Sequence, residues 1–468
     1  MNNKLERKYG LFTAICMVVG IVIGSGVFFK AQTILTKTGG NMPLGILAWI
    51  IGGGIMLVCL LTFSFMGQKY ERVNGLVDYA EATVGSKYGY YMGWFSATIY
   101  FPGMTSALVW LSARYTLEFI TSAVPGFPMA IPAAEGGCIF GPEVMALSLF
   151  YLCMIYGLNA LSPKLAGKMQ TTTTVIKMIP LALMAVVGLI VGLTSGMLQE
   201  NFVTMAQTAE VSASPLFAAV CATAFAYEGW IIATSINSEI KDSRKNLPKA
   251  LVLGGLIIVM VYLFYYIGVA GGATNQELID SGATVAFTNI FGGFLGNILN
   301  LFIAISCLGT TNGLMLGCTR CMYSLAERKE GPKPEMYSQV DKVTNMPNNS
   351  AIFALIVTGA WFLYFYASNL AGIWSGPFVF DSTELPIITI YLMYLPMLIQ
   401  WMRKEKEQPV LRRFVFPALA LCGSLFMIVA SIFSHRMACF WYLIVFAVIM
   451  LIGGLLQGSG KDAGKQTQ

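Results

Sequence analysis

The chain has 468 residues, of which 56% are hydrophobic and only 11% are charged, and its mean hydropathy is +0.68. Soluble domains carry roughly 25% charged residues, so this composition predicts an integral membrane protein with little room for a soluble domain. The chain has one histidine, His435, and its ten cysteines are scattered through apolar segments. We therefore expect no metal site, no cofactor and no enzyme activity, and the net charge of +6 gives no sign of nucleic-acid binding.

Twelve segments are long and apolar enough to cross a bilayer, since a spanning helix needs about 20 such residues. We expect an all-α membrane protein with these spans, at about 10–35, 42–67, 88–119, 143–162, 165–195, 213–238, 250–272, 288–326, 350–369, 383–402, 412–433 and 437–457. They form a single domain over residues 1–457, whose longest external connections are 120–142 and 273–287. The Gly-, Lys- and Gln-rich tail 458–468 is expected to be disordered.

The positive charges test this topology and give its direction. An even number of spans puts both termini on one side, and 23 of the 29 Lys and Arg residues fall on that side. The opposite side has only Lys30, Lys37 and Arg436. Because loops rich in Lys and Arg stay in the cytoplasm, we expect both termini to be cytoplasmic.

The first span is interrupted by Gly24, Ser25 and Gly26, within the run VVGIVIGSGVFF at residues 18–29. Each glycine costs about 1 kcal/mol in a helix interior, so the helix is expected to break there. Lipid cannot satisfy the freed backbone groups, which must then face a cavity. The N–H groups that begin the second half-helix favour an anion such as a carboxylate. The alternative is a close helix-packing patch, which small residues also form.

The sixth span, PLFAAVCATAFAYEGWIIATSINS at residues 215–238, carries Glu228 and Gly229 near its middle. An ionisable residue there costs at least about 2.5–3.5 kcal/mol unless it faces a cavity or a partner. Two interrupted helices five spans apart predict two inverted repeats with a binding site between them. The repeats would cover about 10–195 and 213–402, followed by two helices at about 412–457. The alternative is a structural glutamate buried against a neighbouring helix.

Lys177 is the second unusual charge. It lies thirteen residues after Lys164 on the fifth span, which is about 20 Å deeper along a helix. That depth is too great for the ammonium group to reach the interface easily. Lys177 either serves transport or forms a structural ion pair, with Glu228 as a candidate partner.

Four motifs resemble those of the amino acid–polyamine–organocation transporters. GIVIGSGVFF (20–29) is similar to their first-helix signature, and 94–115 resembles their third span. AFAYEGW (224–230), followed by SEIKDSRKNLPKA (238–250), resembles the sixth helix of L-type amino acid transporters and bacterial serine/threonine exchangers. SCLGTTNGLMLGCTRCMYSLAERKEGP (306–332) resembles the eighth span of the same group. The resemblance covers the whole chain and is specific for the family, though not for the substrate.

The resemblance implies a binding site for an amino acid. It places the substrate carboxylate at Ser25 and Gly26, with Gly24 giving the bend. The substrate ammonium group would be held by backbone carbonyls of Val22, Phe225 and Glu228. Phe225 resembles an aromatic lid, for which the alternative is plain packing. The expected substrate-binding set is Val22, Gly24, Ser25, Gly26, Phe225, Tyr227, Glu228, Gly229, Cys307, Thr310 and Asn312.

Asn312 and Glu228 each have an alternative role. Cys307, Thr310 and Asn312 would line the subsite for the substrate side chain, but an asparagine in a membrane also ties helices together. Glu228 departs from the L-type pattern, which has a small residue there, and resembles the bacterial exchangers. It is expected either to exchange a proton or to hold a cationic side chain.

The family also places a lysine at the position of Lys177, close to where sodium binds in sodium-coupled members of the fold. The resemblance implies that its ammonium group replaces sodium in bracing the first and eighth helices. The eukaryotic L-type group is tied to a heavy chain by a cysteine after the third span. The comparable stretch here, 126–132, has no cysteine and Cys138 is displaced, so we expect no covalent partner.

The favoured function is alternating-access transport of neutral amino acids across the cell membrane, by sodium-independent exchange or proton-coupled uptake. The first alternative is a basic amino acid or polyamine antiporter that uses Glu228 as its cation site. A channel is disfavoured because two broken helices closing over one site do not make a continuous polar pore. A sensor is disfavoured by the short tail, and an enzyme by the lack of a nucleophile–base pair.

Overall fold

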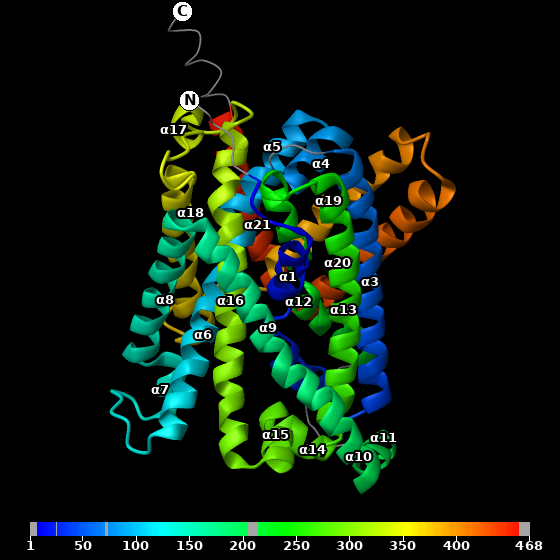
Figure 1. Ribbon diagram of the computed structural model, residues 1–468, viewed down its shortest axis with the longest axis vertical. Helices are drawn as coiled ribbons and strands as arrows, with labels where there is room; N and C mark the ends of the chain where they lie inside the picture. The colour runs from blue at the N-terminus through cyan, green and yellow to red at the C-terminus, as the bar shows by residue number, and fades with distance from the viewer. Residues whose placement is uncertain (1–6, 25, 71–73, 205–213, 458–468) are drawn as a thin grey trace, which may run out of the picture.

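The computed structural model describes residues 7–24, 26–70, 74–204 and 214–457. In that part of the chain every regular element is a helix, apart from one β-bridge between Tyr9 and Ile240. The helices form one bundle, in which α1 and α12 lie near the centre and α16 runs beside them almost from end to end (Figure 1). The all-α membrane fold expected from the sequence is therefore confirmed.

The helices that correspond to the twelve expected spans follow in chain order. They are α1 (Leu11–Val22) with α2 (Gly26–Lys37); α3 (Met42–Lys69); α5 (Ser86–Phe95), η1 (Ser96–Tyr100) and α6 (Phe101–Ala123); α8 (Pro142–Leu161); α9 (Pro163–Leu183), η3 (Met184–Gly188) and α10 (Leu189–Ser195); α12 (Pro215–Tyr227) with η4 (Trp230–Glu239); α13 (Ser243–Ala270); α16 (Gly293–Ala326); α18 (Asn348–Tyr364) with η5 (Phe365–Leu370); α19 (Leu385–Lys404); η6 (Leu411–Val415) with α20 (Phe416–His435); and α21 (Met437–Gln457).

Shorter helices occupy the connections. These are α4 (Gly75–Thr83), η2 (Ala133–Glu135), α7 (Gly137–Phe140), α11 (Met197–Val203), α14 (Asn275–Ser281), α15 (Ala283–Phe291) and α17 (Pro334–Tyr337). The two long connections expected at 120–142 and 273–287 are thus partly helical. The tail 458–468, for which disorder is predicted, lies outside the described residues.

Within the described residues, ten helices are long and apolar enough to cross a membrane, and the bent pair α1–α2 makes an eleventh. The remaining expected span, 88–119, lies within a continuous helix over 86–123 that is less apolar, with Arg114 and Glu118 near its end. Every residue of α6 from Phe101 to Ala113 is buried. Because this helix faces protein rather than lipid, it does not need a uniformly apolar surface.

Two expected boundaries are wrong. The sequence predicts the eighth span at 288–326, but α16 begins at Gly293, because the backbone turns at Gly292 with a φ of 86°. It predicts the seventh span at 250–272, but α13 begins at Ser243, since the basic segment before residue 250 is already helical. Hydropathy marks the apolar part of a helix and misses polar turns outside the membrane.

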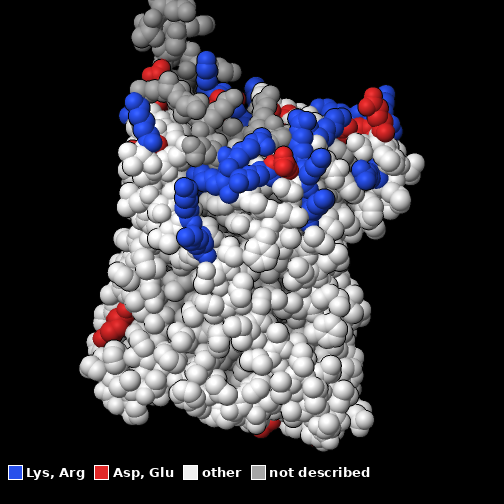
Figure 2. Space-filling view, viewed as in Figure 1, with Lys and Arg blue, Asp and Glu red and all other residues white. Residues whose placement is uncertain are grey.

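The charged side chains are distributed unevenly over the surface. In Figure 2, Lys and Arg gather at one end of the molecule, and the rest of this face is almost uncharged. This end carries α4 and α17, whereas α14 and α15 lie at the other end (Figure 1). The uncharged middle is the surface expected to face lipid.

Candidate functional site

The first span breaks where the glycines predict it. Helix α1 ends at Val22 and α2 begins at Gly26, and the two helices are inclined by 48°. Ser25, expected to bind the substrate carboxylate, lies outside the described residues. A Cβ added at Gly26 would lie 2.9 Å from Cα of Ala226 on α12. Glycine is therefore required for the start of α2 to approach the sixth span so closely.

The sixth span breaks at the predicted pair Glu228 and Gly229. Helix α12 ends at Tyr227, Glu228 is extended, and Gly229 has a φ of 104°, which L-residues with a side chain rarely adopt. The chain then continues as the 3₁₀-helix η4. The two breaks thus leave half-helix ends facing each other in the middle of the bundle.

Tyr262 of α13 connects the carbonyl ends of the two broken helices. Its hydroxyl lies 3.0 Å from the carbonyl of Val22 and 2.9 Å from that of Ala226. A phenol has one proton to donate, so only one of these carbonyls can accept it at a time. The remaining acceptor capacity suits a cationic group placed between the breaks.

One small cavity lies between the breaks, with a free volume of about 20 Å³. Seven of the predicted site residues line it: Val22, Gly24, Gly26, Phe225, Glu228, Gly229 and Thr310. Apolar side chains complete the wall, among them Ile21, Met104 and Leu108. A cavity of this size holds little more than one water molecule, so a larger ligand requires the surrounding helices to move apart.

Glu228 is the charged group of this cavity and is almost fully buried. The hydroxyl of Tyr100, from η1, donates a hydrogen bond to its Oε1. Its Oε2 has no hydrogen-bond partner among the described residues. A buried carboxylate oxygen without a donor is costly, which makes it suited to receive a proton or a cation.

Lys177 joins the first break to the eighth span. Its Nζ lies 2.7 Å from the carbonyl of Gly20 and 2.5 Å from that of Ile23, both in the first span. It also lies 3.2 Å from the carbonyl of Ser306 and 3.3 Å from Oγ1 of Thr310, both on α16. These four partners are neutral oxygens, so among the described residues Lys177 is held by hydrogen bonds to the first span and α16 rather than by the ion pair with Glu228 that was considered from the sequence.

The structure does not bring Tyr227, Cys307 or Asn312 to the cavity wall. The Tyr227 hydroxyl donates to the carbonyl of Trp49, 3.0 Å away, because its ring points toward α3. The Asn312 Nδ2 donates to the carbonyl of Ala166, and its Oδ1 accepts from Asn159, so the asparagine ties helices together.

Cys307 of α16 is also fully buried and does not line the cavity. Sequence reasoning missed Tyr100 and Tyr262. Tyrosines are frequent throughout these spans, and only the packing shows which hydroxyls point at the breaks.

Comparison with known proteins gives the family. The model of the amino acid permease family matches residues 9–455, which is almost the whole chain. The chain belongs to the amino acid permease family. It is therefore a multi-pass membrane protein of a transporter family, as the four sequence motifs indicated.

Three relatives cover nearly the full chain. The serine/threonine exchanger SteT of Bacillus subtilis (strain 168) is 28% identical over 448 residues, covering 94% of each chain. The human Asc-type amino acid transporter 1 is 25% identical over 447 residues, covering 93% of this chain and 79% of its own. The human large neutral amino acids transporter small subunit 2 is 24% identical over 445 residues, covering 93% and 77%.

Proposed function

We propose that the protein moves neutral amino acids across the cell membrane by alternating access, as a sodium-independent exchanger. The observation that carries this proposal is the meeting of two helix breaks at one cavity, where half-helix ends of opposite polarity face each other. The relatives are named for exchange of serine and threonine and for transport of large neutral amino acids, which supports neutral substrates.

The proposed pose of the substrate follows from the polarity of the helix ends. The carboxylate lies at the N–H groups that begin α2 at Gly26, where a half-helix N-terminus favours an anion. The ammonium group lies at the carbonyl ends of α1 and α12, beside Val22 and Ala226. Phe225 lines the same cavity and covers the substrate. Release requires α1, α2 and α12 to separate, because the cavity is too small for an amino acid.

Sodium independence rests on Lys177. Its buried ammonium group has three N–H donors for four oxygens of the first span and α16 that lie within 3.3 Å, which is the bracing that a bound metal cation would otherwise supply. A fixed positive charge at this place leaves no electrostatic reason for a sodium ion to bind beside it.

The test is uptake of radiolabelled serine into liposomes that contain the purified chain. Exchange predicts uptake that requires internal serine and is the same in sodium and in choline buffers. Uptake into empty liposomes that is driven by an inward proton gradient would show that transport is coupled to protons and is not exchange. Glu228 or Lys177 would then be the proton site. A strict sodium requirement would contradict the role assigned to Lys177.

A second candidate is antiport of basic amino acids or polyamines. It is favoured by one observation, the Oε2 of Glu228, which lies at the cavity without a hydrogen-bond donor among the described residues. Glu228→Gln separates the two candidates, since it removes the charge and keeps the shape. A neutral exchanger is expected to retain serine exchange, whereas an arginine or putrescine antiporter loses its transport at least tenfold, the loss of a buried charge partner.

We also propose that both termini are cytoplasmic and that no partner is attached through a disulfide. The end of the molecule rich in Lys and Arg in Figure 2 supports the first point. Cys138, in the connection after the third span, supports the second because it is buried on α7, with its Sγ 3.9 Å from Oγ1 of Thr121. The two inverted repeats, about 10–195 and 213–402, are part of the same proposal.

A further inference from the structure

A cluster of charged side chains lies outside the substrate cavity, toward the end that we assign to the outside. It joins Lys30 of α2, Glu384 at the start of α19 and His435 at the end of α20. The Lys30 ammonium group pairs with Oε1 of Glu384. The His435 Nε2 lies 3.1 Å from Oε2 of the same carboxylate. Their side chains are only 10%, 22% and 15% exposed, so the three groups interact largely shielded from water.

This cluster reaches the substrate cavity through Lys30. The Lys30 Nζ lies 5.3 Å from the centre of the Phe225 ring, within the range of a cation–π contact. Phe225 is the aromatic residue that lines the substrate cavity on α12. One continuous line of contacts therefore runs from the outer end of α20 to the substrate cavity. It consists of the His435 imidazole, the Glu384 carboxylate, the Lys30 ammonium group and the Phe225 ring.

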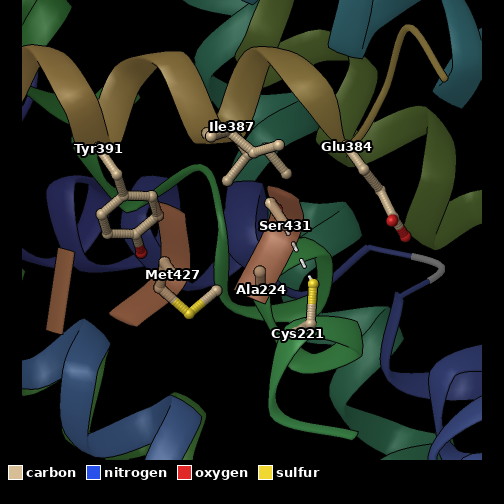
Figure 3. Close-up of a pocket in the computed structure, with 8 residues that line it drawn as sticks. Cys221, Ala224, Glu384, Ile387, Tyr391, Met427 and Ser431 are labelled. Carbon is tan, nitrogen blue, oxygen red and sulfur yellow. Dashed lines mark hydrogen bonds between the residues drawn. The ribbon is translucent and has the colours of Figure 1, made fainter. Parts of the chain in front are cut away.

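A second small cavity, of about 10 Å³, has Glu384 in its wall (Figure 3). Glu384, Ile387 and Tyr391 reach it from α19, and Ser431 from α20. Cys221 reaches it from α12, with its Sγ 3.8 Å from Oγ of Ser431. Cys221 and Phe225 are four residues apart on α12, so they share one face of that helix. Separation of α2 from α19 would open a path from outside to the Cys221 thiol.

We propose that Lys30, Glu384 and His435 form the outer gate of the substrate site, and that His435 makes closure of this gate depend on external pH. The gate holds α2 and α12, which carry the substrate, against α19 and α20. This inference rests on the alternating-access function and on the outward orientation proposed above. Neither the family match nor the relatives' names assign a role to these three residues.

The sign of the pH effect follows from the charges around the imidazole. The charged groups that face it are Glu384, Asp381 and Lys30, and the Cys221 thiol lies beside Glu384. Burial alone would raise the pKa of Glu384, but Lys30 and His435 hold this pKa well below its usual range. Glu384 therefore stays ionised throughout the range in which an imidazole titrates, pH 5 to 8.

Two carboxylates and one ammonium group thus face a neutral imidazole at high pH. When the gate opens, Lys30 leaves with α2, whereas Glu384 and His435 remain together on the α19 and α20 side. Because the Lys30 ammonium group repels a protonated imidazole, protonation of His435 works against the closed arrangement. Acid outside is therefore expected to favour the open gate, and alkali outside to favour the closed gate.

The Cys221 thiol provides a direct measurement of this gate. Intact cells that express the full chain are treated with a membrane-impermeant maleimide at external pH values from 5.5 to 8. Modification at Cys221 is read by mass spectrometry and corrected for the reagent's own pH dependence on an exposed model thiol. Lys30→Met and Glu384→Gln are expected to raise the labelling rate about tenfold, a shift of about 1.4 kcal/mol toward the open form. In the wild-type chain the corrected rate rises about threefold from pH 8 to 5.5 as the imidazole titrates.

The matched controls lie on the same elements. Lys37→Met removes the other lysine of α2, and Arg436→Gln removes the exposed cation next to the histidine; neither should change the labelling. His435→Gln should leave labelling possible but independent of pH. Unchanged labelling in Lys30→Met and Glu384→Gln overturns the gate, and a pH dependence that persists in His435→Gln overturns the sensor. Labelling needs no transport, so failure of serine exchange in liposomes contradicts the proposed function without deciding this test.

Discussion

At the scale of single residues, the most specific prediction concerns Lys177. Its Nζ is the common donor to two carbonyls of the first span and to two oxygens of α16. Lys177→Ala removes the charged donor next to the helix break and leaves the carbonyls of Gly20 and Ile23 to the weaker hydroxyl donors of Ser306 and Thr310. An under-satisfied buried acceptor costs about 1–3 kcal/mol. We expect serine exchange in proteoliposomes to fall at least tenfold while the chain still inserts into the membrane, the kinetic equivalent of about 1.4 kcal/mol.

The control for Lys177 lies on the same helix. Lys168 is exposed near the start of α9, so Lys168→Ala removes an equal charge without touching the break. Its exchange rate should match the wild type. Equal exchange by Lys177→Ala and the wild type would show that the lysine is only a packing residue.

The same scale shows why only part of the site could be predicted from the sequence. Gly24, Gly26 and Glu228 stand out because glycine and ionisable residues are expensive inside a membrane helix. Tyr100 and Tyr262 contact the site as closely, but a tyrosine carries no such cost and its direction depends on packing. Asn312 shows a second ambiguity, since an intramembrane amide can line a site or tie helices together, and its hydrogen bonds here join it to Ala166 and Asn159.

At the scale of elements, the break in the sixth span depends on the backbone of Gly229. Its φ of 104° is strained for any residue with a side chain, and a Cβ would lie 3.0 Å from Cγ2 of Ile21. Gly229→Ala should therefore cost about 1–2 kcal/mol, lower the melting temperature of the purified protein and abolish most exchange.

Gly54 offers the matched comparison for this element. It lies inside the unbroken helix α3, and a Cβ there would meet nothing within 4 Å. Gly54→Ala should leave exchange intact and raise stability by up to about 1 kcal/mol, since alanine is the better helix former. If both substitutions shifted the melting temperature in the same direction, the break would not depend on the glycine backbone.

The spans, like the site residues, could be predicted only in part, because hydropathy locates a helix but does not show its neighbours or its ends. The apolar runs located every spanning segment, but α6 is less apolar than a lipid-facing helix because its neighbours are protein. The start of α16 is predicted too early, because hydropathy does not register the turn at Gly292. Composition reports what surrounds a helix, whereas its ends are set by backbone geometry.

At the scale of the whole molecule, one set of contacts closes the charged end of the bundle. Arg320 of α16 donates from Nε and Nη2 to the two carboxylate oxygens of Glu239, at 2.6 and 3.1 Å. The Lys8 Nζ lies 3.2 Å from the same carboxylate. The backbone adds to this, since the N–H groups of Lys8 and Tyr9 donate to the Glu239 carbonyl and that of Lys241 to the Tyr9 carbonyl. The start of α1, the end of η4 and α16 are thereby held together.

An alternating-access cycle must break this closure each time the charged end opens. Burial alone would raise the pKa of Glu239, but Arg320 and Lys8 hold it below its usual value, so the carboxylate stays charged at neutral pH. Removing one partner of a buried pair leaves the other charge uncompensated, which costs about 3–5 kcal/mol. Arg320→Gln should therefore lower the melting temperature strongly and slow exchange, because the closed form is the one destabilised.

The double variant Glu239→Gln with Arg320→Gln removes the stranded charge and should recover part of the lost stability. Lys69→Gln serves as the control. Lys69 also pairs with a glutamate, Glu405, but its side chain is 46% exposed, and exposed ion pairs contribute only about 0–1 kcal/mol to stability. Melting temperatures of the four purified proteins, the wild type included, decide the point. If the double variant is no more stable than Arg320→Gln, the stranded carboxylate is not the cause of the loss, and closure of this end rests on the backbone contacts of Tyr9 instead.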